Sequence, residues 1–82
     1  MKKLSLRKQA QLAPKYVLKM EGLDLYYSDK QPLSGFDVTE NIKEAMLFSV
    51  GFDNQEIKVG AISALAQYHT NNKNVKFEVV YL

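Results

Sequence analysis

Two segments in which apolar and polar residues alternate constrain the fold of this 82-residue chain more than any other feature. Between Lys15 and Met20 the residues Tyr16, Leu18 and Met20 fall on one side, and residues 75–82 alternate in the same way with Val75, Phe77, Val79 and Tyr81 on one face. A period of two residues is typical of strands that place one face against a core. A chain of this length forms one small domain, so we expect both strands in one sheet.

A hairpin is expected to follow the first strand. Glu21-Gly22 supplies a turn, and residues 23–28 alternate again, which predicts a second, antiparallel strand. Residues 29–35 contain proline, serine and glycine and indicate a loop, after which residues 36–38 are expected to form a third, short strand.

Two helices are predicted between the hairpin and the last strand. Thr39 is a good N-cap for a short helix over about 40–48, which Gly51 would end. Asp53 with Glu56 forms a capping box for a longer helix over 54–69, and Phe52 with Ile57 occupies the positions of a hydrophobic staple. The stripe of this helix expected to face the sheet consists of Ile57, Ala61, Ala64, Leu65 and Tyr68.

These elements together predict an α+β domain. Its small antiparallel sheet is expected to contain the N-terminal hairpin and the C-terminal strand, with both helices packed on one face. The asparagine-rich run 71–74 predicts the turn that joins the long helix to the last strand, because asparagine tolerates left-handed backbone angles.

Charge divides the chain into two parts. Residues 1–15 carry five basic residues and no acidic one, whereas residues 16–82 carry six basic and nine acidic residues. We expect residues 1–14 to form a flexible basic arm, with a short amphipathic helix as the alternative, because Pro14 stops any helix before the domain 15–82 begins.

The residue types present argue against several classes of function. The chain has no cysteine, which excludes disulfides, thiolate metal sites and a cysteine nucleophile. It has no apolar run long enough for a membrane span or a secretory signal, so we expect a cytoplasmic protein without membrane contact. His69 is the only histidine and falls in the last turn of the long helix, where the helix dipole favours it, and no serine lies in a nucleophile elbow. We therefore expect no enzyme, no cofactor, no metal and no small-molecule substrate.

The favoured function is binding to another protein or to a second copy of the chain. A second apolar row on the long helix is the first candidate surface, and Gly60 and Ala64 would let another backbone approach it. The alternative is that this row packs on the short helix 40–48. Further candidates are an open sheet edge and the free face of the last strand. The residues of these candidate surfaces are Val59, Ile62 and Ala66 on the helix and Val80 and Leu82 on the strand.

Nucleic-acid binding is the alternative function. The basic arm would contact phosphates and the sheet tyrosines would stack on bases. Acidic residues among the same strands oppose this hypothesis, and the sequence favours a protein partner. The residues expected to contact nucleic acid are Lys2, Lys3, Arg7, Lys8 and Tyr26, with Tyr16, Tyr27, Phe77 and Tyr81 as further stacking candidates.

A resemblance to a group of known proteins rests on three segments. Residues 15–19 (KYVLK), 25–27 (LYY) and 39–48 (TENIKEAMLF), followed by a helix and a valine-rich strand, resemble small uncharacterised proteins of phages and prophages of Gram-positive bacteria. The resemblance covers most of residues 15–82. It implies an intracellular, accessory context and no particular mechanism.

Overall fold

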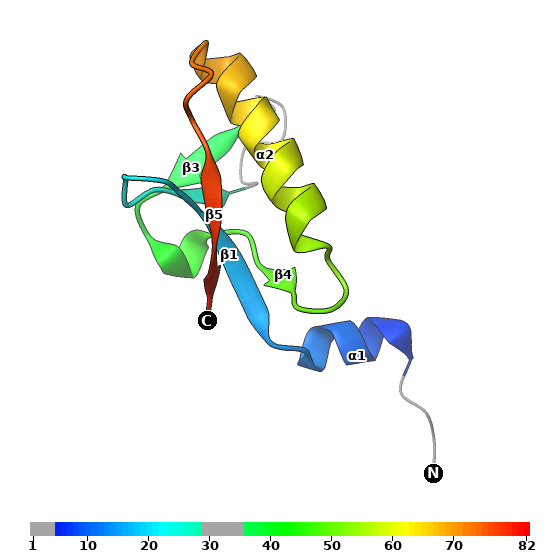
Figure 1. Ribbon diagram of the computed structural model, residues 1–82. Coiled ribbons are helices and arrows are strands. Elements are labelled where there is room, and N and C mark those ends of the chain that lie inside the picture. The colour runs from blue at the N-terminus through cyan, green and yellow to red at the C-terminus, as the bar shows by residue number, and fades with distance from the viewer. Residues whose placement is uncertain (1–4, 29–35) are drawn as a thin grey trace.

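The computed structural model describes residues 5–28 and 36–82 (Figure 1). In this part of the chain the elements are α1 (Leu6–Leu12), β1 (Lys15–Met20), β2 (Tyr26–Ser28), β3 (Asp37–Thr39), the 3-10 helix η2 (Ile42–Glu44), β4 (Phe48–Ser49), α2 (Gln55–Thr70) and β5 (Phe77–Tyr81). All strand pairs are antiparallel, which confirms the α+β class.

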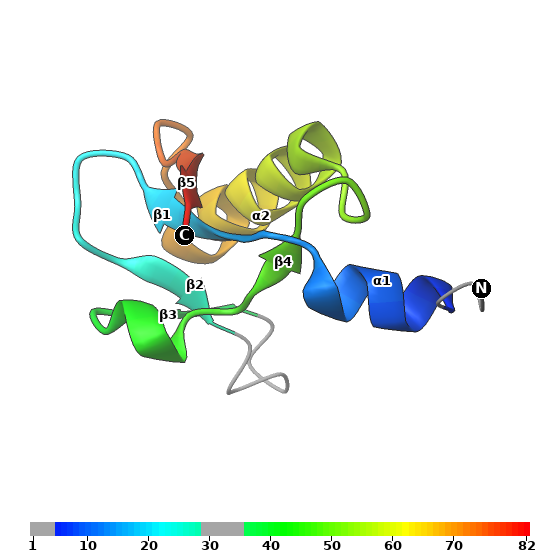
Figure 2. The same cartoon turned by 90° about the horizontal axis from the view of Figure 1, so that it is seen from below.

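β1 is the central strand of the sheet. On one side, residues 16–20 of β1 pair with β5, from Tyr16 opposite Tyr81 to Met20 opposite Phe77. On its other side it pairs with β4 near its start and with β2 near its end, and β3 adds to β2 (Figure 2). One strand therefore holds three others in place.

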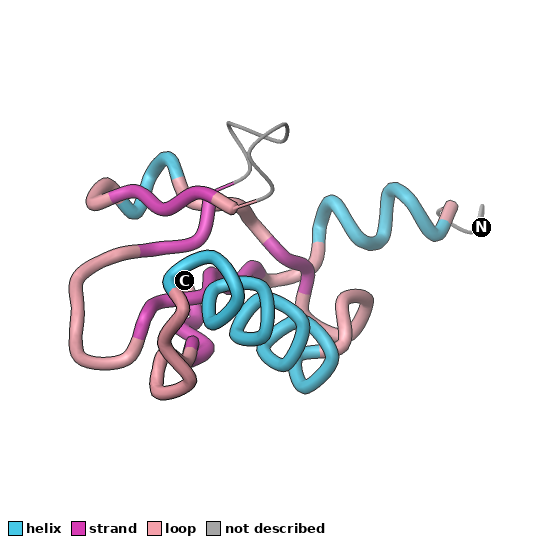
Figure 3. The backbone as a smooth tube through the Cα atoms, turned by 90° about the horizontal axis from the view of Figure 1, so that it is seen from above, coloured by secondary structure: helices cyan, strands magenta, loops and turns pink. Residues whose placement is uncertain are grey.

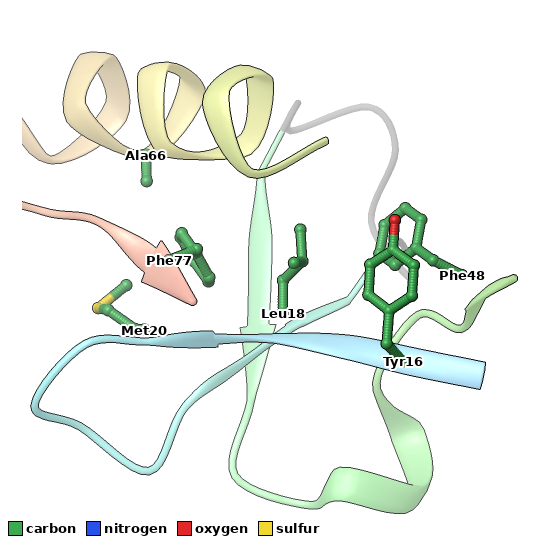
Figure 4. Close-up of a cluster of buried hydrophobic side chains, with 6 residues drawn as sticks. All are labelled: Tyr16, Leu18, Met20, Phe48, Ala66 and Phe77. Atoms are coloured by element: carbon green, nitrogen blue, oxygen red, sulfur yellow. The ribbon is translucent and has the colours of Figure 1, made fainter. Parts of the chain in front are cut away.

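The core lies between α2 and the face of the sheet that carries Tyr16 and Leu18 (Figure 4). The Tyr16 ring stacks on Phe48 with 5.3 Å between ring centroids. Val17, which points to the opposite face, is also fully buried, and the chain between β3 and β4 passes on that side (Figure 4). The buried residues of the main cluster are Tyr16, Leu18, Met20, Phe48, Ala66 and Phe77.

Most of the strand and turn predictions are confirmed. β1 has the expected limits, and Gly22 adopts a φ of 80° in the turn that follows it, a conformation that favours glycine. β2 begins later than expected, and the short third strand is present over Asp37–Thr39. Asn71 ends α2 in the left-handed conformation with a φ of 51°. The loop predicted over residues 29–35 lies outside the described residues.

The helix predicted over 40–48 is wrong. The structure has only the three-residue η2 there, followed by extended backbone at Ala45 and by β4. A helix this short gains little from its own hydrogen bonds. Here the sheet offers better partners, because the Met46 amide donates to the carbonyl of Tyr27 at 2.9 Å and Phe48 pairs with Tyr16. The second helix of the structure is instead α1.

Two details of the long helix also differ from the prediction. Its N-cap is Asn54, whose side chain accepts from the Ile57 amide at 3.0 Å, while the Asp53 carboxylate accepts from the Ser49 amide at 2.7 Å. The stripe expected in the core is on the outside, since Ile57 and Tyr68 are 65% and 81% exposed. The residues of α2 that are buried against the sheet are small, Ser63 and Ala66, because Tyr16, Leu18 and Phe77 already fill the space between the layers, and Val59 and Ile62 pack at the margins of this core.

The basic arm is helical where the structure describes it. Ser5 caps α1 by accepting from the Lys8 amide at 3.2 Å, and the helix ends at Leu12, before Pro14 as expected. No residue of α1 is buried, and the helix lies beside the body rather than on the sheet (Figure 3). Residues 6–12 therefore form the helix that the sequence offered as the alternative to a flexible arm.

Candidate interaction surface

The outer side of β5 is an open sheet edge. Leu82 donates its amide to the Lys15 carbonyl at 3.0 Å, and Glu21 donates to the Lys76 carbonyl at 2.8 Å, so the even-numbered residues of this strand bond to β1. Backbone direction alternates along a strand, so Phe77, Val79 and Tyr81 direct their N–H and C=O groups away from β1. In Figures 1 and 2, β5 lies on the outside of β1, and no strand of the described residues pairs with its outer side.

α2 closes the first part of this edge. The hydroxyl of Ser63, a side chain that is 8% exposed, accepts from the Phe77 amide at 3.0 Å. The Gln67 side-chain amide donates to the Val75 carbonyl at 2.9 Å. The Phe77 C=O and the outward N–H and C=O groups of Val79 and Tyr81 therefore stay open. We refer to the groups of Val79 and Tyr81, the two residues whose N–H and C=O are both open, as the open edge.

The open edge lacks the features by which proteins protect sheet edges. Natural edge strands are shortened, charged, interrupted by proline or covered, because an unpaired edge invites another strand. β5 contains no proline, and its one charged residue, Glu78, forms an ion pair with Lys19 of β1 at 3.6 Å. The edge strand at the other end of the sheet, β3, has only three residues and carries Asp37. At the β5 end of the sheet, protection is thus limited to the part that α2 covers.

Two apolar side chains flank the open edge. Tyr81 is 60% exposed and Leu82 is 62% exposed. The Tyr81 hydroxyl and the Gln55 side-chain amide are joined by hydrogen bonds of 2.6 and 2.9 Å, and the Tyr81 ring meets the Tyr16 ring edge-on at 6.4 Å. These contacts fix the Tyr81 ring while leaving more than half of its surface to solvent, which is typical of aromatic anchors at interfaces.

A shallow groove of about 400 Å³ lies between α2 and the start of β5. A Cβ added at Gly60 would meet no atom within 4 Å, so the α2 side of this groove is unobstructed. The groove is lined by Glu21, Val59, Gly60, Ser63, Ala64, Gln67, Lys76 and Phe77.

A polar clamp joins α1 to the sheet. The Lys15 ammonium donates both to the Ala10 carbonyl and to the Ser49 hydroxyl, the latter at 2.8 Å. The Ser49 hydroxyl donates in turn to the same Ala10 carbonyl at 2.9 Å. A serine beside a lysine is also found in some hydrolases, but here both groups bond to a backbone carbonyl of α1, so the arrangement holds a helix in place.

Other chemistry finds little support in the described part of the chain. No group of three histidine, aspartate or glutamate side chains there is placed to hold a metal ion. Burial, together with nearby Asp53 and Tyr81, raises the pKa of the Tyr16 hydroxyl above its ordinary value, and this hydroxyl donates to the Asp53 carbonyl at 3.0 Å. His69 stacks on the Phe36 ring at 5.9 Å. No helix within residues 5–28 and 36–82 has the length and apolar character needed to cross a bilayer.

The structure separates the residues of the predicted interaction surface. Ala66 is fully buried, and Val59 and Ile62 pack against the core, so this helical row faces the core and does not form a free surface. Val80 is half-buried and Leu82 is exposed, both beside the open edge. Sequence reasoning identified an open edge without locating its limits. The signal it missed is Ser63, a single hydroxyl in an apolar row of the helix.

The residues of the predicted nucleic-acid surface are also dispersed. Tyr16 and Phe77 lie in the core and present no ring to a base, and Tyr26 is half-buried in β2. Arg7 and Lys8 are exposed on α1, and this helix projects away from the sheet (Figure 2). Lys2 and Lys3 lie outside the described residues. The described basic residues and the sheet aromatics therefore do not form one surface.

No family model, no curated protein and no solved structure matches this chain.

Proposed function

We propose that this chain is a non-enzymatic protein-binding module that receives a strand of its partner at the open edge of β5. The observation that carries the proposal is the outward N–H and C=O groups of Val79 and Tyr81, which have no partner strand in the described residues. Strand addition of this kind gives affinity through backbone hydrogen bonds and specificity through side chains that alternate between the two faces.

The surroundings of the open edge support this role. Tyr81 is already fixed by Gln55 and Tyr16, so its ring loses little conformational freedom when a partner covers it. Leu82 and Tyr81 would be buried by the same event, which adds apolar area to the hydrogen bonds. A peptide strand can use both the N–H and the C=O groups of this edge, whereas the phosphates of a nucleic acid can accept only from its N–H groups.

The context that we propose follows from the resemblance of most of residues 15–82 to small uncharacterised proteins of phages and prophages of Gram-positive bacteria. The chain would act as an accessory protein in the cytoplasm, by occupying a site on another protein rather than by turning over a substrate.

Site-specific photo-crosslinking in the cells that naturally express the chain tests the proposal. A photo-reactive amino acid in place of Leu82, beside the open edge, should give covalent protein adducts. The same amino acid in place of Tyr68, which is 81% exposed on the far side of α2, is the matched control and should give none. Adducts at position 68 but not at 82 would refute strand addition at β5.

A further inference from the structure

We infer that the partner at the open edge is a second copy of this chain, paired β5 to β5 in antiparallel orientation about a two-fold axis between the two Val80 residues. This inference rests on the proposed function and names its partner. It follows from the number of open backbone groups, from the position at which α2 closes the edge, and from the side chains that would meet.

The closed part of the edge selects the register. In an antiparallel pair, two directly opposite residues exchange both of their hydrogen bonds, and the next pair along exchanges none. With Val80 opposite Val80 of the second copy, Val79 faces Tyr81 and Tyr81 faces Val79, which makes four hydrogen bonds from the open edge alone. A register centred on Val79 would require the Phe77 amide, which already donates to Ser63 at 3.0 Å.

The side chains in this register match. On the face that carries α2, the half-exposed Tyr81 ring of each copy lies beside Val79 of the other. On the opposite face the two Val80 side chains meet at the axis, in a pair position where side chains approach closely. Glu78 remains engaged with Lys19 of its own sheet and faces Leu82 of the second copy, so no like charges are brought together.

The short length of the open edge favours a second copy over a flexible peptide. Only Val79 and Tyr81 offer both an open N–H and an open C=O, so an extended peptide would make few bonds for the conformational freedom that it loses. A second copy presents the same edge already fixed in a sheet, with its Tyr81 ring already held by Gln55. The product is one continuous sheet with both α2 helices on the same face, because a two-fold axis perpendicular to the sheet preserves its faces.

Charge exchange at the axis tests this inference. Val80→Lys places two ammonium groups across the axis, and Val80→Glu places two carboxylates there, so each variant alone should dimerise at least tenfold more weakly than the wild-type chain. An equimolar mixture should form a heterodimer, measured by sedimentation velocity and by native mass spectrometry with one variant isotopically labelled. Glu78→Gln, on the same strand and face but away from the axis, is the control and should change the dimer affinity less than threefold.

A second measurement keeps the test valid if a Val80 variant does not fold. In the wild-type chain, hydrogen exchange of the Val79 and Tyr81 amides should slow as protein concentration rises, while exchange of the Phe77 amide, held by Ser63, should not change. A wild-type chain that stays monomeric with concentration-independent exchange at Val79 and Tyr81 overturns the inference. If crosslinks from position 82 to a different protein are then found, the proposed function survives, and if they are also missing, both fail.

Discussion

The bond between Ser63 and the Phe77 amide should contribute measurably to stability. Ser63 lies in the middle of α2 and is 8% exposed, so Ser63→Ala leaves a buried N–H group without its acceptor. Such a loss costs about 1–3 kcal/mol, and alanine returns roughly 0.5 kcal/mol through its higher helix propensity. The net loss of about 0.5–2.5 kcal/mol should lower the unfolding temperature by roughly 2–20 °C in a domain of fewer than about 100 residues.

Circular dichroism melts and amide exchange measure this effect. The Phe77 amide should exchange faster in Ser63→Ala than in the wild-type chain. Thr70→Ala is a suitable control, because it removes a hydroxyl that donates to the Ala66 carbonyl at 2.7 Å from an exposed position, and it should change stability by less than about 0.5 kcal/mol. An unchanged melting temperature with slow Phe77 exchange would refute the assignment of Ser63 as the group that closes the edge.

Four further predictions follow from the fold and the charges. Ile62→Glu should unfold the domain because Ile62 packs against the core. Ile57→Glu on the same helix should leave the circular dichroism melt nearly unchanged because Ile57 is 65% exposed. Equal effects of the two substitutions would contradict the orientation of α2. Because the pKa of Tyr16 is raised, its contribution to stability is complete below the ordinary tyrosine value of 10.0 and is lost as the pH rises through the folded-state pKa. The melting temperature of Tyr16→Phe should therefore fall less at alkaline pH than that of the wild-type chain. A chain that starts at Ala13 should melt within about 4 °C of the full chain because α1 buries no residue, and a loss above about 8 °C would show that α1 is part of the fold. The full chain should not bind random oligonucleotides at about 0.15 M salt, as measured by fluorescence anisotropy. Micromolar binding that disappears when Lys2, Lys3, Arg7 and Lys8 are replaced by glutamine would restore the nucleic-acid hypothesis.

The sequence predicts the strands well because the alternation of residues between the two faces of a strand is a local pattern that does not depend on the rest of the chain. Tyr16, Leu18 and Met20 alternate with Val17 and Lys19, and Gly22 follows at the point where a positive φ is needed. Local signals were sufficient there. The α+β class follows from the same pattern, since one long helix between such strands must cover the face that they leave apolar.

The helical predictions failed where two local patterns compete. Residues 40–48 have good helix signals, but Phe48 is needed beside Tyr16 in the core, and this tertiary contact overrides a marginal helix. α2 carries two apolar rows, one that includes Ile57 and one that includes Val59 and Ile62, so periodicity alone does not identify which row is buried. The decisive fact is the bulk of the sheet side chains, which requires Ser63 and Ala66 to face them, and that fact depends on strand pairing across the whole chain.

The limits of the open edge were also beyond the reach of the sequence. An edge strand is predictable from the number of strands, but its open length depends on which α2 side chains reach it. Ser63 and Phe77 are 14 residues apart, and only the crossing of α2 over β5 brings them together.

The pairing of β1 with β5 has a consequence for how the chain is made. Tyr16 lies opposite Tyr81, so the first strand of the sheet leaves the ribosome 65 residues before its longest partner. Contacts between such distant residues close slowly, and until they form, nascent chains expose apolar surface that aggregates. A chain stalled before Phe77 would carry one side of β1 unpaired and the sheet-facing row of α2 only partly covered, and it should be bound by chaperones or degraded more readily than the finished chain.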